Sequence, residues 1–189
     1  PPRSTLFPYT TLFRSVISRW FSLAKDNPGF TERLGAHKKG LAKFNPFDVS
    51  DKSEYTLCKY ILLHTISHLL VKQLEYVCGY PAASMNERIY VSGKNHSGIM
   101  VYTVSGSEGS YGGIVTIVER GDITQLMLEA FEKAKFCSND PVCYSNSSIC
   151  FSCGLLPESS CESFNTLLDR SFVVDRSEEH TSELQSPNT

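Results

Sequence analysis

The sequence contains no apolar run as long as the roughly 20 residues that a membrane-spanning helix needs, so we expect no membrane partner. It also lacks an excess of charge of either sign, because 18 basic and 20 acidic residues leave a formal net charge of −2. This balance argues against a strong grip on nucleic acid by this chain alone. The sequence has no GK[ST] phosphate-binding loop, internal repeat or low-complexity segment. Without such a loop, it predicts no ATP hydrolysis.

Both ends of the sequence differ in kind from the middle. Residues 1–15 (with TLFRS) and 176–189 (with RSEEHTSELQS) match the translated ends of two short-read sequencing adapters. We therefore expect both segments to be artefacts of library preparation and leave them out of fold reasoning. The rest divides into an N-terminal flanking segment, 16–52, and a domain over 53–175, a length that suits one buried core. We expect the natural protein to extend beyond both ends.

Two segments carry the apolar pattern of helices. Residues 53–77 bring apolar or weakly polar side chains onto a broad face, and Gly79 and Pro81 follow as stop signals. So much apolar surface predicts a central buried helix. Residues 122–135 place apolar side chains on one stripe, which predicts a second helix that leads directly into Cys137.

A small sheet is expected between these two helices. Residues 88–91 and 98–104 have the composition of strands, and the turn-forming residues at 92–97 suit a hairpin. Residues 114–118 fit either a further strand or the start of a helix. We expect the sheet to run from residue 88 to about residue 118.

The N-terminal flanking segment contains a turn and a small basic patch. Residues 27–29 (NPG) predict a turn, and Lys38, Lys39 and Lys43 follow in a stretch that reads as a loop. A solvated surface is the simpler interpretation of these lysines. A contact with a DNA backbone is the alternative.

The cysteines carry the clearest chemical signal, because five of the seven fall between Cys137 and Cys161. Cys150 and Cys153 form a CxxC turn, which places two thiolates within reach of one tetrahedral zinc ion. Cys137 and Cys143 would complete the shell, with Cys161 in reserve. Disulfides in a secreted chain and a redox-active CxxC pair are the alternatives, but an odd cysteine count with CxxC spacing favours metal in a reducing cytoplasm. The expected fold class is α+β, with a central buried helix, a small β-sheet and a four-cysteine, zinc-stabilised C-terminal lobe.

A second group of polar residues could form a site in the core. His64 and His68 stand four apart on the predicted central helix, which stacks both imidazoles on one face. The simpler interpretation is a pair of core histidines hydrogen-bonded to backbone or acids, and Glu108 could pair with either histidine or with Arg88. A metal-dependent hydrolase that uses His64, His68 and Glu108 is the rival hypothesis. For the adjacent Glu87 and Arg88, a structural salt bridge is favoured over catalysis.

Six short motifs, in order, resemble one known family. Together they resemble the C-terminal domain of DrmB proteins of the DISARM anti-phage system, within the MrfA zinc-binding domain family, formerly a domain of unknown function. The resemblance covers about residues 55–174. The motifs are HTISHLL (64–70), CGYPAAS followed by ERIYV (78–91), GIMVYT (98–103), SEGSYGG (107–113), CSNDPVC (137–143) and CFSCGLLPESSCE through NTLLDR (150–170).

The resemblance implies a function as well as a fold. It implies a non-catalytic zinc-binding domain, over 53–175, that is attached to a superfamily 2 DNA helicase or works beside one in the cytoplasm. Contact with DNA would then be indirect, and Zn²⁺ would be a structural cofactor. The ligands that the resemblance implies are Cys137, Cys143, Cys150 and Cys153, with Cys161 as an alternative ligand.

Overall fold

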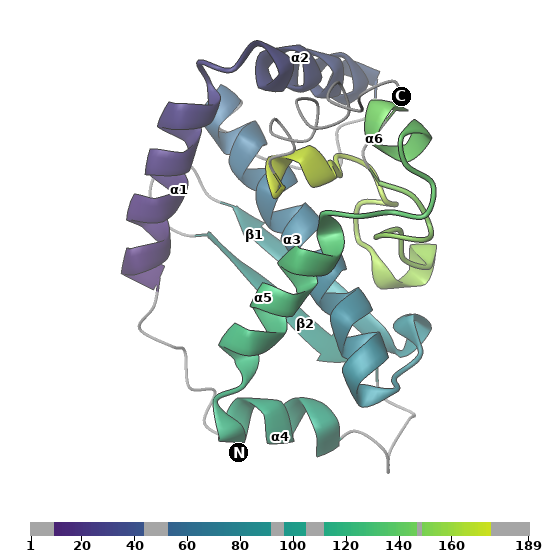
Figure 1. Cartoon of the computed structure of the whole chain (residues 1–189). Coiled ribbons are helices and arrows are strands. Elements are labelled where there is room, and N and C mark those ends of the chain that lie inside the picture. Colours follow the sequence, from purple (N-terminus) through teal and green to yellow (C-terminus); the bar gives the residue numbers. More distant parts are fainter. Residues whose placement is uncertain (1–9, 44–52, 92–96, 105–111, 147–148, 175–189) are drawn as a thin grey trace, which may run out of the picture.

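The computed structural model describes residues 10–43, 53–91, 97–104, 112–146 and 149–174. Within these ranges, the structure has six α-helices and a two-stranded antiparallel sheet, and the other elements are arranged around one long helix, α3 (Figure 1). The α+β fold class expected from the sequence is confirmed.

The long helix α3 covers Glu54–Cys78. Ser53 caps its start, because the Ser53 hydroxyl oxygen accepts a hydrogen bond from the backbone N–H of Thr56 at 3.3 Å. Gly79 ends it at a φ of 69°, a left-handed conformation that glycine adopts without strain, and its N–H donates to the carbonyl of Glu75 at 3.0 Å. The predicted start and end of the central helix are therefore confirmed.

Helix α3 is buried on most of its faces because other elements pack along its length. It contacts α5 (Ile123–Ala134) and a hairpin made of β1 (Met85–Val91) and β2 (Ser97–Thr103), which lies behind it in Figure 1. The two strands are antiparallel, with the first residue of β1 opposite the last residue of β2. A helix enclosed in this way buries polar as well as apolar side chains, and α3 buries both of its histidines.

Two N-terminal helices complete the core around the first half of α3. Helix α1 covers Thr10–Ala24 and α2 covers Pro28–Lys43. Ile17 and Leu34 from these helices join the buried cluster on α3. Phe172, near the end of the described chain, packs against aromatic rings of both helices. The segment predicted as a flank thus contributes side chains to the core.

The expected extent of the sheet is wrong. Residues 114–118 lie in helix α4 (Gly112–Arg120), so the sheet ends at Thr103 and does not reach residue 118. The physical reason is the spacing of the buried side chains: Ile114 and Ile117 stand three apart and both pack against the core, which is a helical period.

The expectation of a loop around the basic patch is also wrong, because Lys38 and Lys39 lie within α2. Asn27 caps the start of this helix, because its side-chain oxygen accepts hydrogen bonds from the backbone N–H groups of Gly29 and Phe30 at 2.9 and 3.3 Å. The ring of Pro28 fixes φ near the value that the first helical position needs. Lys38 forms an ion pair with Glu54 at the start of α3.

The C-terminal lobe is short of regular structure. It contains helix α6 (Val142–Asn146) and two 3-10 turns at Glu158–Ser160 and Arg170–Phe172, and a third such turn at Ala82–Ser84 precedes β1. Loops therefore make up most of the segment that carries the clustered cysteines.

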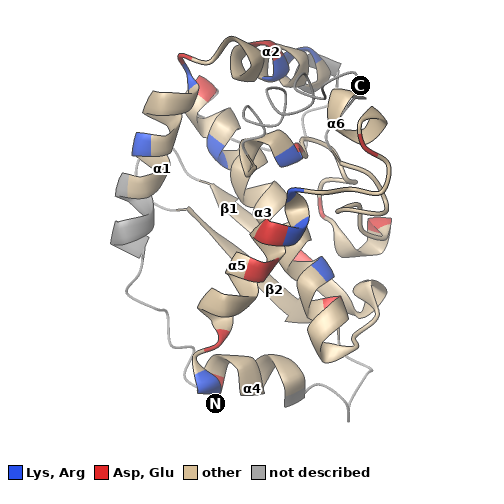
Figure 2. Cartoon of the chain, in the orientation of Figure 1, with Lys and Arg blue, Asp and Glu red and all other residues tan. Residues whose placement is uncertain are grey.

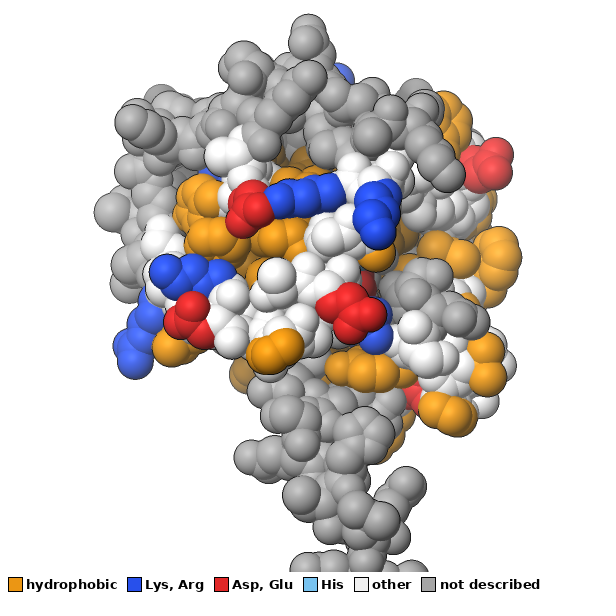
Figure 3. All heavy atoms as spheres, turned by 90° about the horizontal axis from the view of Figure 1, so that it is seen from above, with side chains coloured by type: hydrophobic (Ala, Val, Ile, Leu, Met, Phe, Trp, Pro, Cys, Tyr) orange, Lys and Arg blue, Asp and Glu red, His pale blue; other side chains and the backbone are white. Residues whose placement is uncertain are grey.

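Charged residues of both signs are spread over the elements (Figure 2). On the face drawn in Figure 3, basic and acidic side chains lie next to one another around exposed hydrophobic side chains. No helix among the described residues is both long and apolar enough to cross a membrane.

Candidate metal centre

Four cysteines from three neighbouring segments meet in the C-terminal lobe: Cys137 after α5, Cys143 in α6, and Cys150 and Cys153 in the following loop. Their sulfur atoms all lie within 4.8 Å of one another. Sγ–Sγ distances are 3.5 Å for Cys137–Cys150, 3.7 Å for Cys143–Cys153 and 3.9 Å for Cys150–Cys153. Zinc–sulfur bonds of about 2.3 Å give a tetrahedron with edges of about 3.8 Å. The four sulfurs therefore have the spacing of a tetrahedral zinc shell.

The CxxC turn is shaped by backbone hydrogen bonds to one carbonyl. The N–H groups of Cys153, Gly154 and Leu155 point at the Cys150 carbonyl, at 3.2, 2.8 and 2.9 Å. The N–H of Cys150 in turn donates to the sulfur of Cys153 at 3.2 Å. This tight turn holds both sulfurs on the same side of the loop.

Asn139 supplies two further donors to the sulfurs. Its side-chain amide donates to Cys150 Sγ at 3.3 Å and its backbone N–H donates to Cys137 Sγ at 3.4 Å. N–H groups aimed at sulfur favour the thiolate, which is the form that binds metal. The surroundings of the four sulfurs are thus those of metal ligands.

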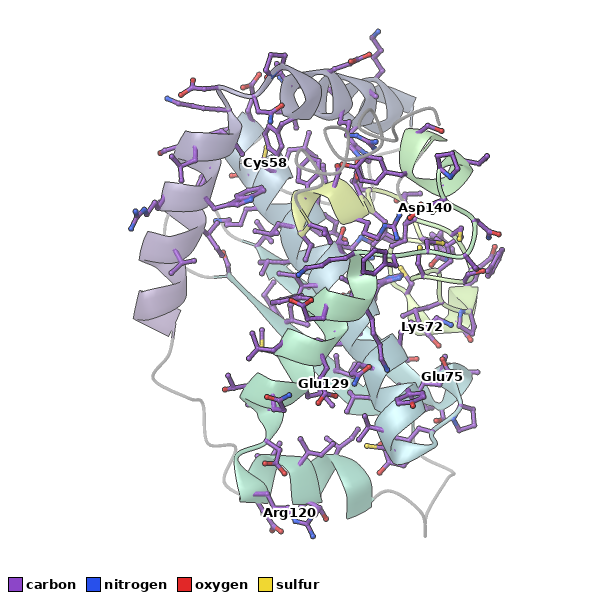
Figure 4. The ribbon with its side chains drawn as sticks, in the orientation of Figure 1. Cys58, Lys72, Glu75, Arg120, Glu129 and Asp140 are labelled. Atoms are coloured by element: carbon purple, nitrogen blue, oxygen red, sulfur yellow. The ribbon has the colours of Figure 1, made fainter. Side chains whose placement is uncertain are left out.

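Asp140 ties this lobe to the core. One carboxylate oxygen accepts the N–H of Cys137 at 3.1 Å, and the other accepts from the guanidinium of Arg170 at 2.6 Å. The Arg170 side chain is fully buried. In Figure 4, Asp140 lies beside the sulfur atoms of the lobe, whereas Cys58 is far away near the start of α3. A part-buried ion pair therefore links the cysteine cluster to the core.

The thiol pKa values differ strongly within the cluster. Burial raises the pKa of Cys143 well above its ordinary value, with the neighbouring sulfurs adding to the effect, and burial raises the pKa of Cys153 to about 11. Burial also opposes ionisation of Cys150, but hydrogen bonds from Asn139, Cys137 and the backbone outweigh it and lower the pKa of Cys150 to about 6. Four adjacent thiolates are therefore stable together when a cation offsets their charge.

A second cluster lies in the core and contains Cys161, which the structure separates from the other four cysteines. His64 and His68 of α3, Glu87 of β1 and Cys161 bring one ligand atom each to within 4.8 Å of the others. His64 Nε2 is 2.9 Å from Glu87 Oε1 and 3.2 Å from Cys161 Sγ, and His68 Nε2 is 3.3 Å from the same Glu87 oxygen. All four side chains are buried.

Two neighbours hold the second cluster in place. His68 donates from Nδ1 to the carbonyl oxygen of Gly154 at 2.8 Å, so this histidine is anchored to the loop that carries the CxxC turn. The hydroxyl of Ser67 donates to the second oxygen of Glu87. The predicted pair of core histidines, bonded to backbone and to an acid, is what the structure contains.

The pKa values in this cluster reflect burial opposed by ion pairing. Burial lowers the pKa of His64 despite its contact with Glu87. Burial alone would raise the pKa of Glu87, but hydrogen bonds and charge interactions with His64 and His68 outweigh it and lower that pKa. Burial raises the pKa of Cys161 to about 12. The carboxylate is thus the stable negative charge of this group.

The acid in this cluster is Glu87, which the sequence predicts to form a salt bridge with Arg88. Arg88 instead forms a half-exposed ion pair with Glu162 at 3.2 Å. Glu108 lies outside the described residues, as do residues 92–96 of the turn predicted over 92–97, whose last residue begins β2. The alternation of inward and outward side chains along β1 indicates that Glu87 points into the core, because Met85 and Glu87 both face inward, at 0 and 1% exposure.

Comparison with known proteins gives one informative relative. No family model matches the sequence. A DISARM protein DrmB from Bacillus paralicheniformis is 37% identical over 170 residues, which cover 85% of this chain. The similarity supports a DrmB-related domain. The chain spans 30% of the length of this curated relative.

Proposed function

We propose that this chain is a non-catalytic, zinc-binding accessory domain of a DrmB-related anti-phage defence protein. The observation that carries the proposal is the tetrahedral spacing of four sulfurs in a lobe with little other structure. The ligands would be Cys137, Cys143, Cys150 and Cys153. The similarity to DISARM protein DrmB supports the defence role.

A structural role for the metal follows from the ligand set. Four thiolates fill the shell of zinc and leave no open position for a substrate or a water nucleophile. Because the lobe consists mostly of loops, binding of the metal would contribute directly to its folding free energy. All seven cysteines are free thiols, which suits the reducing cytoplasm that we propose as the compartment.

We further propose that the domain, of the MrfA zinc-binding type and spanning 53–175, works beside a DNA helicase partner or fused helicase domains. The near balance of basic and acidic residues supports an indirect role in DNA engagement, because Lys and Arg side chains make the main contacts with phosphates. The ion pair between Lys38 and Glu54 also neutralises part of the positive charge of the basic patch on α2.

Metal analysis of purified protein tests the zinc proposal. The Cys150→Ser/Cys153→Ser variant removes two ligands and is expected to contain one zinc per chain less than the unmodified chain, with a C-terminal lobe that becomes sensitive to proteolysis. Elemental analysis beside limited proteolysis measures both effects.

Cys78→Ser is the matched control, because Cys78 is a free thiol that belongs to neither cluster. It is expected to keep the zinc content and the protease resistance of the unmodified chain. An unchanged zinc content in the double variant would contradict the proposal, as would a folded, zinc-free protein.

A further inference from the structure

We propose that His64, His68, Glu87 and Cys161 form a second metal site, which holds one structural zinc ion in the core. Its ligands are distinct from those of the cysteine site, although the Gly154 carbonyl that anchors His68 lies in the loop of that site. The four side chains come from α3, from β1 and from the loop after the turn at Glu158–Ser160.

The spacing of the ligand atoms fits a tetrahedral ion. Zinc bonds of about 2.0–2.1 Å to nitrogen or oxygen and about 2.3 Å to sulfur give edges of about 3.3 Å between nitrogen and oxygen and about 3.6 Å between nitrogen and sulfur. The two distances from histidine Nε2 to Glu87 Oε1 are 2.9 and 3.3 Å. The distance from His64 Nε2 to Cys161 Sγ is 3.2 Å. Small movements of the side chains would open the centre for the ion.

The hydrogen bonds of His68 leave a conflict that a cation would resolve. Because Nδ1 of His68 donates to the Gly154 carbonyl, a neutral ring presents a lone pair at Nε2. That lone pair faces Glu87 Oε1, which is also an acceptor. Two acceptors at this distance repel each other unless a proton or a metal ion lies between them, and a metal ion here would also lie within reach of His64 and Cys161.

The outer contacts of two of the ligands, His68 and Cys161, also match those of known metal sites. A ligating histidine usually donates its second ring N–H to a backbone carbonyl or carboxylate, as His68 does to Gly154. The sulfur of Cys161 accepts the backbone N–H of Asn165 at 3.3 Å. The Asn165 side chain then bonds both backbone groups of Leu156, at 3.0 and 2.9 Å, which closes the loop around Cys161.

The backbone after Cys161 is strained in a way that the site would explain. Phe164, Asn165 and Leu167 have φ values of 50°, 57° and 55°, although none is glycine. The left-handed region costs such residues on the order of 1 kcal/mol each, so it persists only where other contacts fix the loop. A bond from the metal to Cys161 would be one of these contacts.

The ligand set points to zinc and to a structural role. Two imidazoles, one carboxylate and one thiolate are a mixed nitrogen, oxygen and sulfur set, which suits zinc better than magnesium or calcium. All four side chains are at most 3% exposed, and together they fill the tetrahedral shell. The site therefore offers no position for a water nucleophile, which argues against a hydrolase at His64 and His68.

Counting zinc in the whole chain by native mass spectrometry tests the second site. The unmodified chain is expected to carry two zinc ions. Glu87→Gln keeps the shape of the side chain but removes its charge and one ligand oxygen, and Cys161→Ser replaces the thiolate with a weaker ligand. Each is expected to reduce the count by one while the cysteine site keeps its ion. Glu162→Gln is the matched control, because Glu162 adjoins Cys161 but lies in a half-exposed ion pair, and it is expected to keep two ions.

The Cys150→Ser/Cys153→Ser variant covers the case in which Glu87→Gln or Cys161→Ser fails to fold. It removes no ligand of the core cluster and is expected to retain one zinc, which would be bound without the cysteine site. One zinc in the unmodified chain that disappears in this double variant would overturn the second site and leave the cysteine site standing. One zinc that persists in the double variant but disappears in Glu87→Gln would support the second site and contradict the cysteine site.

Discussion

Substitution of Gly154 tests how closely the cysteine loop packs on the core. Gly154 follows Cys153, and its carbonyl accepts the hydrogen bond from His68, so this residue joins the two clusters. A Cβ atom at position 154 would lie 2.5 Å from Cδ1 and 2.8 Å from Cγ1 of Ile149. Ordinary contacts between carbon atoms are about 3.5–4.0 Å, so the side chain of Ile149 would have to move by about 1 Å.

The size of the effect follows from the burial of Ile149, which is 8% exposed. Overpacking of a buried site costs about 1–3 kcal/mol, so Gly154→Ala is expected to lower the free energy of unfolding by that amount. A loss of 1 kcal/mol lowers the melting temperature of a domain of this size by about 2–4 °C. We therefore expect Gly154→Ala to melt about 2–12 °C below the unmodified chain.

A double-mutant cycle separates this clash from other effects. Ile149→Ala alone removes both clashing atoms and is expected to cost about 2–4 kcal/mol through the cavity that it leaves. In the double variant the new methyl group at position 154 occupies part of that cavity, so the clash is relieved. The double variant should therefore lose less free energy of unfolding than the two single variants lose together, by at least about 1 kcal/mol. Thermal unfolding of all four proteins in saturating zinc measures the cycle. Strictly additive losses would refute the close approach of the loop to Ile149.

Two further predictions concern ion pairs. Burial alone would raise the pKa of Asp169, but His37 and Arg33 of α2 help to lower it, so Asp169→Asn is expected to cost about 1.5–3 kcal/mol at neutral pH. A lowered carboxyl pKa stabilises the fold above the unfolded value of about 3.9, and this stability is lost as the pH falls through the folded value. Denaturant unfolding should therefore show a constant difference between the two proteins from pH 5 to 8 that shrinks below about pH 4; a difference that vanishes already at pH 6 would contradict the assignment. Arg88→Ala breaks only the half-exposed ion pair with Glu162, so it is expected to change the free energy of unfolding by less than about 1 kcal/mol and to leave the zinc count unchanged. Loss of a zinc ion in this variant would contradict the prediction.

The central helix and the cysteine cluster could be predicted because their signals are local. A serine cap, a long apolar segment and a glycine stop define α3 without knowledge of its partners. The CxxC turn likewise brings two sulfurs together through contacts within four residues, Cys150 to Cys153. Such features depend on neighbours in the sequence, and the structure places them where the sequence indicated.

The core cluster was harder to predict because it depends on long-range packing. The helical spacing of His64 and His68 predicts that they lie together, but it does not indicate which carboxylate they contact. Glu87 is that carboxylate because β1 starts at Met85, three residues before the predicted strand. With the earlier start, the period of two turns Glu87 inward towards the histidines. Cys161 reaches the same group through left-handed loop residues that no propensity rule anticipates.

X-ray absorption at the zinc edge of the purified chain tests the central claim most directly, because it measures the ligands themselves. Two sites with the proposed ligands give an average shell of about 2.5 sulfur atoms and about 1.5 nitrogen or oxygen atoms per zinc, with sulfur at about 2.3 Å. We expect this mixed shell in the unmodified chain and a shell dominated by nitrogen and oxygen in Cys150→Ser/Cys153→Ser. A shell without sulfur in the unmodified chain would contradict the account.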